Sequence, residues 1–128
     1  MKTTLKSKWS LKSPLYLKKS DKRYKRHLKQ LKDNGFSDSE TWGLDSVIAE
    51  FILPRLKRFK EVTNGFPSTL TEAKWDAILD DMIFAFEWDL LDDNDEYEKM
   101  SEKEKKAGWD RYNKGIRLFA EYFRELWW

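Results

Sequence analysis

Four cations that follow a proline form the most compact group of residues that can bind an anion. They occupy the six-residue stretch RLKRFK, which carries a charge of +4. A proline inside a helix removes a backbone hydrogen bond and can leave polar groups available to a ligand. Aromatic rings in the same segment can stack on a base. We therefore expect an anionic, nucleotide-like small molecule to bind Arg55, Lys57, Arg58 and Lys60, with Trp42 or Phe59 as the stacking ring.

A second basic segment lies near the start of the chain. Residues 1–32 contain twelve Lys or Arg and a single acid, Asp21. Such a charge density can follow a phosphate backbone. A nucleic-acid interface is thus an alternative, and its candidate residues are Lys22, Arg23, Lys25, Arg26 and Lys29. Lysine predominates over arginine here, although the guanidinium group of arginine binds phosphate better because it can donate two parallel hydrogen bonds.

Acidic residues dominate the segment 76–98, which contains ten Asp or Glu and no base. This face can imitate the charge of nucleic acid or bind a basic surface of a host protein. Alternatively, the oppositely charged parts of the chain attract one another. Asp76 and Asp80 lie one helical turn apart, but no base or cleft is evident to make them catalytic. We expect no enzyme, no cofactor and no metal site.

Composition excludes several other classes of protein. The chain has 128 residues, no Cys and one His, so disulfide scaffolds, thiolate zinc sites and His clusters are excluded. No apolar run reaches the length of a membrane span. Seven Trp among 16% aromatic residues argue against a disordered chain. The sequence starts without an apolar signal segment, and we expect a cytoplasmic protein.

The apolar residues recur at helical spacing. A first helix is expected over 21–33, before Asn34-Gly35, and a loop over 36–40. A long helix follows from Trp42, and Pro54 is expected to kink it or break it in two. Capping boxes at Thr69–Glu72, with Thr71 as an alternative cap, and at Ser101–Glu104 introduce two further helices. Period-two alternation is lacking, so strands are not expected.

These elements predict an all-α protein: a compact bundle of about four helices with a proline-broken central helix. Residues 1–19 are expected to form a basic N-terminal arm, and residues 20–128 a single helical domain. A helix-exchanged dimer is the alternative. Trp127 and Trp128 at the C-terminus would be poorly soluble if exposed, so they are expected in the core or at a subunit boundary. We expect a homo-oligomer.

Three segments resemble a group of small proteins carried by tailed bacteriophages and prophages. They are residues 42–60 (WGLDSVIAEFILPRLKRFK), 75–86 (WDAILDDMIFAF) and 115–128 (GIRLFAEYFRELWW). The resemblance covers residues 42–128 and excludes the basic arm. It implies a viral protein that acts in the host bacterial cytoplasm, and it brings no catalytic residues.

Small phage proteins without catalytic residues often act by binding, and some counter host defences. By this analogy, the sequence favours a non-enzymatic protein that sequesters a nucleotide-like anion through the Arg55–Lys60 cluster. An inhibitor that grips a host defence protein through its acidic face is the second hypothesis. A nucleic-acid-binding accessory protein that uses residues 1–32 is the third.

Overall fold

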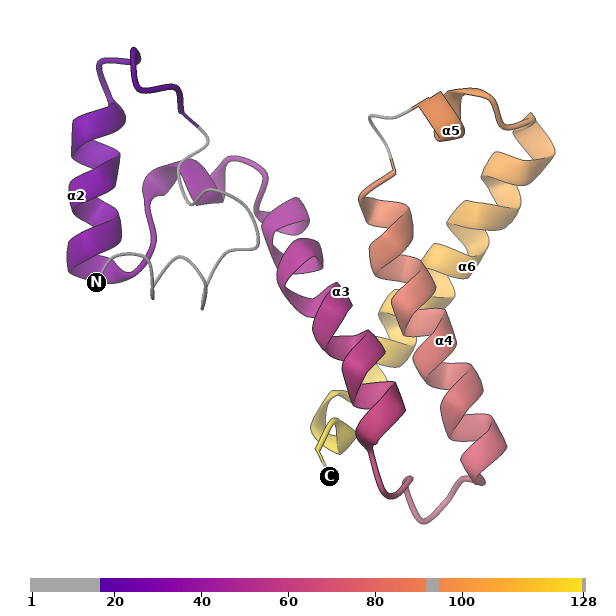
Figure 1. Cartoon of the computed structure of the whole chain (residues 1–128). Coiled ribbons are helices and arrows are strands. Elements are labelled where there is room, and N and C mark those ends of the chain that lie inside the picture. Colours follow the sequence, from indigo (N-terminus) through magenta and orange to yellow (C-terminus); the bar gives the residue numbers. More distant parts are fainter. Residues whose placement is uncertain (1–16, 92–94, 128) are drawn as a thin grey trace. The chain divides into compact units, whose positions relative to one another are not determined.

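The computed structural model describes residues 17–91 and 95–127, and all regular structure in these ranges is helical (Figure 1). The prediction of an all-α protein is confirmed. Except for residues 17–19, the expected basic arm lies outside the described residues. The elements are α2 (Tyr24–Asn34), η1 (Asp38–Thr41), α3 (Leu44–Val62), α4 (Glu72–Asp89), α5 (Asp95–Glu98), α6 (Glu102–Glu121) and η2 (Phe123–Glu125), where η marks a 3-10 helix.

The chain divides into two compact units, an N-terminal unit of residues 1–51 and a C-terminal unit of residues 52–128. Helix α3 begins in the first unit and ends in the second. The two units are defined by the contacts between their residues, which is not the same as folding independently. A single domain over residues 20–128 therefore remains a prediction.

Helix α3 continues through Pro54 as one 19-residue element. The expected break into two helices is therefore not found. Proline at this position removes one hydrogen bond, the one its N–H would donate to the carbonyl of Glu50. Helices in proteins are stabilised mainly by packing. Ala49 and Leu56, on either side of the proline, are both buried, and their packing favours a helical chain on both sides.

Helix α2 starts three residues later than predicted and ends one residue later. The preceding turn is fixed by Asp21, whose carboxylate accepts a hydrogen bond of 2.8 Å from the backbone N–H of Arg23. The predicted stop is confirmed, since Gly35 adopts a φ of 86° and donates its N–H to the carbonyl of Leu31. On the inner face, His27 and Leu31 are buried one turn apart.

Residues 36–40, expected to be a loop, contribute instead to the short helix η1. The sequence contains the signal, because Ser37 and Glu40 have the spacing of a capping box. The backbone N–H of Ser37 donates to the Glu40 carboxylate over 3.0 Å, and the Ser37 hydroxyl caps the backbone of Glu40 in return. Ser37, Ser39 and Glu40 are all buried, so this polar cluster forms part of the interior of the N-terminal unit.

In the C-terminal unit, α4 and α6 lie side by side (Figure 1). Helix α4 buries one face, formed by Trp75, Leu79, Met82, Ala85, Phe86 and Trp88. Its cap is Thr71, not Thr69, and the Thr71 hydroxyl accepts from the N–H of Lys74. The second predicted capping box is confirmed, with Ser101 and Glu104 exchanging hydrogen bonds at the start of α6.

Two glycines of α6 allow α4 and α6 to approach closely. A Cβ atom at Gly108 would overlap the ring of Trp88. A Cβ at Gly115 would overlap the carbonyl oxygen of Asp81 and lie 2.8 Å from Cβ of Ala85. Both glycines are buried. The absence of a side chain at these positions is therefore a steric requirement of the α4–α6 contact.

We predict that Gly115→Ala lowers the free energy of unfolding by about 1–3 kcal/mol, because the new methyl group overlaps backbone atoms of α4. In an unconstrained helix the same change stabilises by about 1 kcal/mol. Urea unfolding followed by circular dichroism measures the difference. Asn113→Ala, at an exposed position on the same helix, is the control and should be neutral or slightly stabilising. A stabilised Gly115→Ala variant would contradict the close contact.

A second prediction concerns Glu40. Burial raises the pKa of this carboxyl group above its ordinary value. At intermediate pH the folded chain therefore retains a proton that the unfolded chain has released. The free energy of unfolding is highest below the pKa that Glu40 has in the unfolded chain, and it falls as the pH rises through the pKa of Glu40 in the folded chain. Glu40→Gln can still accept the Ser37 N–H but cannot ionise.

Relative to Glu40→Gln, the wild-type protein should lose stability between about pH 4 and pH 7. Urea unfolding at both values measures this difference. Glu121→Gln, a substitution at an exposed carboxylate, serves as the control and should show no such pH-dependent difference. Equal pH profiles for wild type and Glu40→Gln would show that the carboxyl group is not desolvated.

Candidate nucleic-acid interface

The cations predicted to bind a small anion lie in the second half of α3, and carboxylates already contact three of them. Lys57 Nζ lies 3.1 Å from Glu87, and Lys60 Nζ lies 2.7 Å from Asp80, both on α4. Arg58 pairs with a neighbour on α3 itself, Glu61, at 3.0 Å. The hydrogen bond that Lys60 donates to Asp80 raises the pKa of Lys60. An anion at this cluster would therefore compete with carboxylates of the protein itself.

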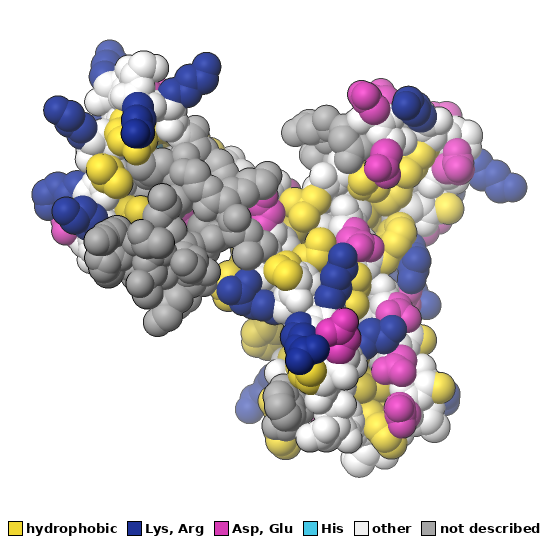
Figure 2. All heavy atoms as spheres, in the orientation of Figure 1, with side chains coloured by type: hydrophobic (Ala, Val, Ile, Leu, Met, Phe, Trp, Pro, Cys, Tyr) yellow, Lys and Arg dark blue, Asp and Glu magenta, His cyan; other side chains and the backbone are white. Residues whose placement is uncertain are grey.

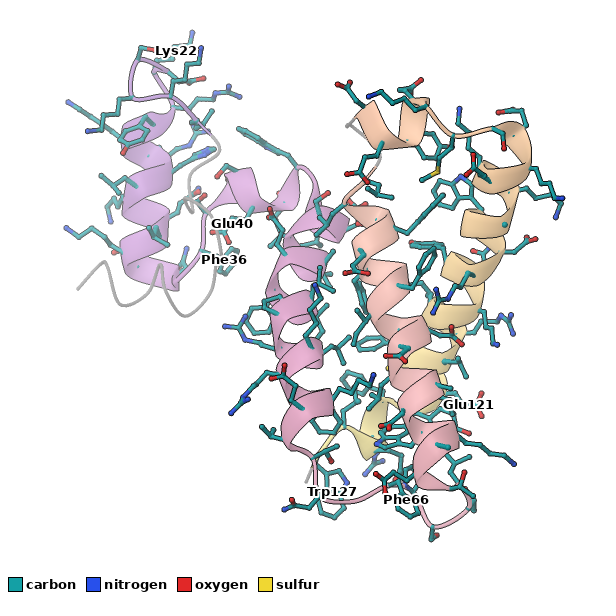
Figure 3. The ribbon with its side chains drawn as sticks, turned by 45° about the vertical axis from the view of Figure 1, so that its right-hand side comes forward. Lys22, Phe36, Glu40, Phe66, Glu121 and Trp127 are labelled. Carbon is teal, nitrogen blue, oxygen red and sulfur yellow. The ribbon has the colours of Figure 1, made fainter. Side chains whose placement is uncertain are left out.

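The rings predicted for the same ligand are divided between the two units. Phe59 is half-buried in the C-terminal unit. Trp42 belongs to the N-terminal unit, where its ring contacts the side chains of Arg23 and His27. A cavity of about 270 Å³ in the C-terminal unit contains none of the predicted cations or rings. Its lining includes Phe66 and Trp127, which lie near each other in Figure 3.

The cations of the N-terminal unit are differently placed. All eight Lys and Arg between residues 17 and 32 are exposed, and Figure 2 shows dark blue side chains around this helix. They include every residue of the predicted nucleic-acid set. The exposed cations are Lys18, Lys19, Lys22, Arg23, Lys25, Arg26, Lys29 and Lys32.

Four of these cations belong to one surface, the basic face of α2, defined as Lys25, Arg26, Lys29 and Lys32. Lys25, Lys29 and Lys32 follow the spacing i, i+4, i+7, so they share one stripe that is about 10 Å long. The stripe points away from the buried His27. Within the part of the chain that the structure describes, only Lys29 of this face pairs with a carboxylate, that of Asp33.

Arg23 extends the positive surface toward Trp42. Asp21 fixes its guanidinium group through two hydrogen bonds, Nε to Oδ1 at 3.0 Å and Nη2 to Oδ2 at 2.8 Å. These bonds lower the pKa of Asp21, so the pair stays ionised at neutral pH. The guanidinium carbon lies 5.2 Å from the centre of the Trp42 ring, in cation–π geometry.

Two hydrogen bonds tie η1, and with it Trp42, to α2. The Gln30 amide donates to the Asp38 carboxylate over 2.9 Å, and the Asp38 backbone N–H donates back to the side-chain carbonyl oxygen of Gln30 over 2.8 Å. Trp42 is the residue that directly follows η1, and its ring lies 5.6 Å from the ring of His27. Arg23 and Trp42, which are distant in the sequence, are thereby brought to one surface.

The same unit contains a cavity of about 740 Å³. Its lining is mainly apolar and includes Phe36 and Glu40, which lie next to each other in Figure 3. Only one cation of the basic face, Lys32, borders it. The remaining lining residues are Asp33, Asn34, Gly35, Thr41, Leu44 and Val47.

Sequence reasoning identifies these cations but misses the position of Trp42. The sequence assigns the ring to the Arg55–Lys60 cluster because both belong to the same aromatic-rich segment. The turn over 37–41 instead brings it against α2. The Ser37–Glu40 capping box indicates a helical turn, although nothing in the sequence indicates the Gln30–Asp38 hydrogen bonds that orient it.

The acidic segment 76–98 is partly neutralised within the C-terminal unit. Asp81 contacts Arg111 at 2.9 Å and Lys114 at 3.4 Å, both on α6, and Asp80 and Glu87 contact cations of α3. Figure 2 shows blue and magenta side chains intermingled on this unit. Residues 92–94, part of the same acidic segment, lie outside the described residues.

The structure also bears on membrane and metal binding. Across residues 17–91 and 95–127, no helix combines the length and the apolar character needed to cross a membrane. In the same ranges, no three Asp, Glu or His side chains are grouped so that they can hold a metal ion. Trp127 is 73% exposed, and Trp128 lies outside the described residues. Burial of Trp127 in the core of its own unit is therefore not observed.

The geometry thus comprises an exposed basic face on α2, an exposed aromatic ring next to Arg23, and a second basic cluster in which at least three cations contact carboxylates. No family model, curated protein or solved structure matches this chain.

Proposed function

We propose that this chain is a non-enzymatic nucleic-acid-binding protein and that the basic face of α2 is its contact surface. One observation carries the proposal: exposed cations repeat along α2, and among the described residues most of them have no carboxylate partner. Cations arranged in this way can replace the counterions of a phosphate backbone. The resemblance of residues 42–128 to phage proteins supports a role in the host bacterial cytoplasm.

A nucleotide-like ligand at the Arg55–Lys60 cluster has less support. A phosphate bound there must displace Glu87 from Lys57 and Asp80 from Lys60, and this exchange reduces the net gain in electrostatic energy. Docking of a host protein on the acidic face has a similar cost, because Asp80, Asp81 and Glu87 already contact cations. Homo-oligomer formation remains a prediction.

The proposal predicts that the protein binds nucleic acid with an affinity that falls steeply with salt. For a single-stranded oligonucleotide, the logarithm of the binding constant should fall with the logarithm of salt concentration, with a slope of about −0.7 for each phosphate contact. Substituting alanine for Lys25, Lys29 and Lys32 together should reduce that slope by about 2. Alanine has a high helix propensity, so α2 should remain folded.

Fluorescence anisotropy with labelled oligonucleotides at several salt concentrations measures the slope. The control variant carries alanine at three exposed cations of α6, namely Lys103, Lys106 and Arg117, which removes the same formal charge. It should retain the wild-type slope. Binding that does not depend on salt, or equal losses in the two variants, would refute a specific role of α2.

A further inference from the structure

Trp42 is an exposed aromatic ring of the N-terminal unit that lies next to Arg23. It is 53% exposed although it belongs to the largest side-chain type. From its geometry we infer that Trp42 stacks on an unpaired base and that the ligand is therefore single-stranded nucleic acid. This inference rests on the proposed function and names the class of nucleic acid that the same surface takes.

The ring is held in place before any ligand binds. The guanidinium of Arg23 lies over it, and Asp21 fixes this guanidinium with two hydrogen bonds. The buried ring of His27 packs against it at an interplanar angle of 56°. A side chain that is already ordered loses little conformational entropy on binding, so more of the stacking energy contributes to affinity.

Two arginines lie near the ring, whereas Lys25, Lys29 and Lys32 lie on the other side of α2. Arg23 and His27 are four residues apart, one turn of helix, and both contact Trp42. Arg26, part of the basic face, follows Arg23 around the helix and lies within 3.5 Å of the His27 ring. A phosphate bound to Arg26 can therefore lie next to a base that stacks on the ring.

The turn that follows the ring is exposed. A Cβ atom at Gly43, the residue after Trp42, would meet no atom within 4 Å. Gly43 and Leu44 are both exposed, so no described side chain closes over this turn. The exposed part of the indole is what a base can reach.

Stacking distinguishes single strands from duplexes. In a duplex both faces of each base are covered by neighbouring bases, whereas an unpaired base can rest on an aromatic side chain. The basic face attracts both forms through their phosphates. The ring should therefore add affinity only for the single strand.

The test compares Trp42→Leu and Trp42→Phe with wild type, using an oligothymidine and a duplex of equal length in fluorescence anisotropy. Trp42→Leu should bind the single strand about ten-fold more weakly and the duplex unchanged. Trp42→Phe keeps a ring and should lose less. Trp127→Leu, at an exposed tryptophan of the other unit, is the control and should match wild type.

A second measurement, tryptophan fluorescence, does not require that Trp42→Leu fold correctly. Single-stranded DNA should quench the tryptophan fluorescence of the wild-type protein. The part of the quenching that comes from Trp42 should be lost in Trp42→Phe and kept in Trp127→Leu. Wild-type affinity of Trp42→Leu for the single strand would overturn the inference. So would equal losses of single-strand and duplex binding in Trp42→Phe.

These outcomes are separate from failure of the proposed function. Wild-type protein that binds neither the oligothymidine nor the duplex at low salt would refute the proposed function, and the inference with it. Wild-type protein that binds both equally, with no effect of Trp42→Leu, would leave the basic face as a nucleic-acid surface and remove only the single-strand preference.

Discussion

Ion pairing along α4 reduces the number of cations in the C-terminal unit that are available to a partner. Three carboxylates of α4 contact four cations: Lys57 and Lys60 of α3, and Arg111 and Lys114 of α6. Exposed ion pairs of this kind contribute little to stability. Their consequence is electrostatic, because each pair neutralises a cation of the C-terminal unit. On the basic face of α2, by contrast, Lys29 alone pairs with a carboxylate among the described residues.

The interior of each unit is stabilised in a different way. In the C-terminal unit, α4 contributes a continuous apolar face, and two glycines let α6 approach it closely. At one end of these helices, the Trp88 ring contacts Tyr97 and Trp109 edge to face, and the Trp109 indole donates a hydrogen bond to the Tyr97 hydroxyl. The N-terminal unit combines a smaller apolar interior with buried polar groups, among them Ser37, Ser39 and Glu40. Such groups specify geometry because each needs its hydrogen-bond partner.

Local patterns explain what the sequence could predict. The apolar spacing of α4 and the capping box at Ser101–Glu104 act within one or two turns, and both are confirmed. The break predicted at Pro54 is not found, because a local rule takes no account of packing on both sides of the proline. The position of Trp42 depends on hydrogen bonds between Gln30 and Asp38, eight residues apart. Charge counts likewise locate the basic segments but cannot distinguish paired cations from solvated ones.

The contact between Gly108 and Trp88 ties two distant positions of the chain to each other. A large ring fills the space that a side chain on the opposite helix would need. Any change that enlarges position 108 must be matched by a smaller residue at position 88, whereas Gly115 faces the backbone of Asp81, which no side-chain replacement on α4 removes. Among descendants of this sequence, positions 88 and 108 should therefore change together, and position 115 should remain glycine.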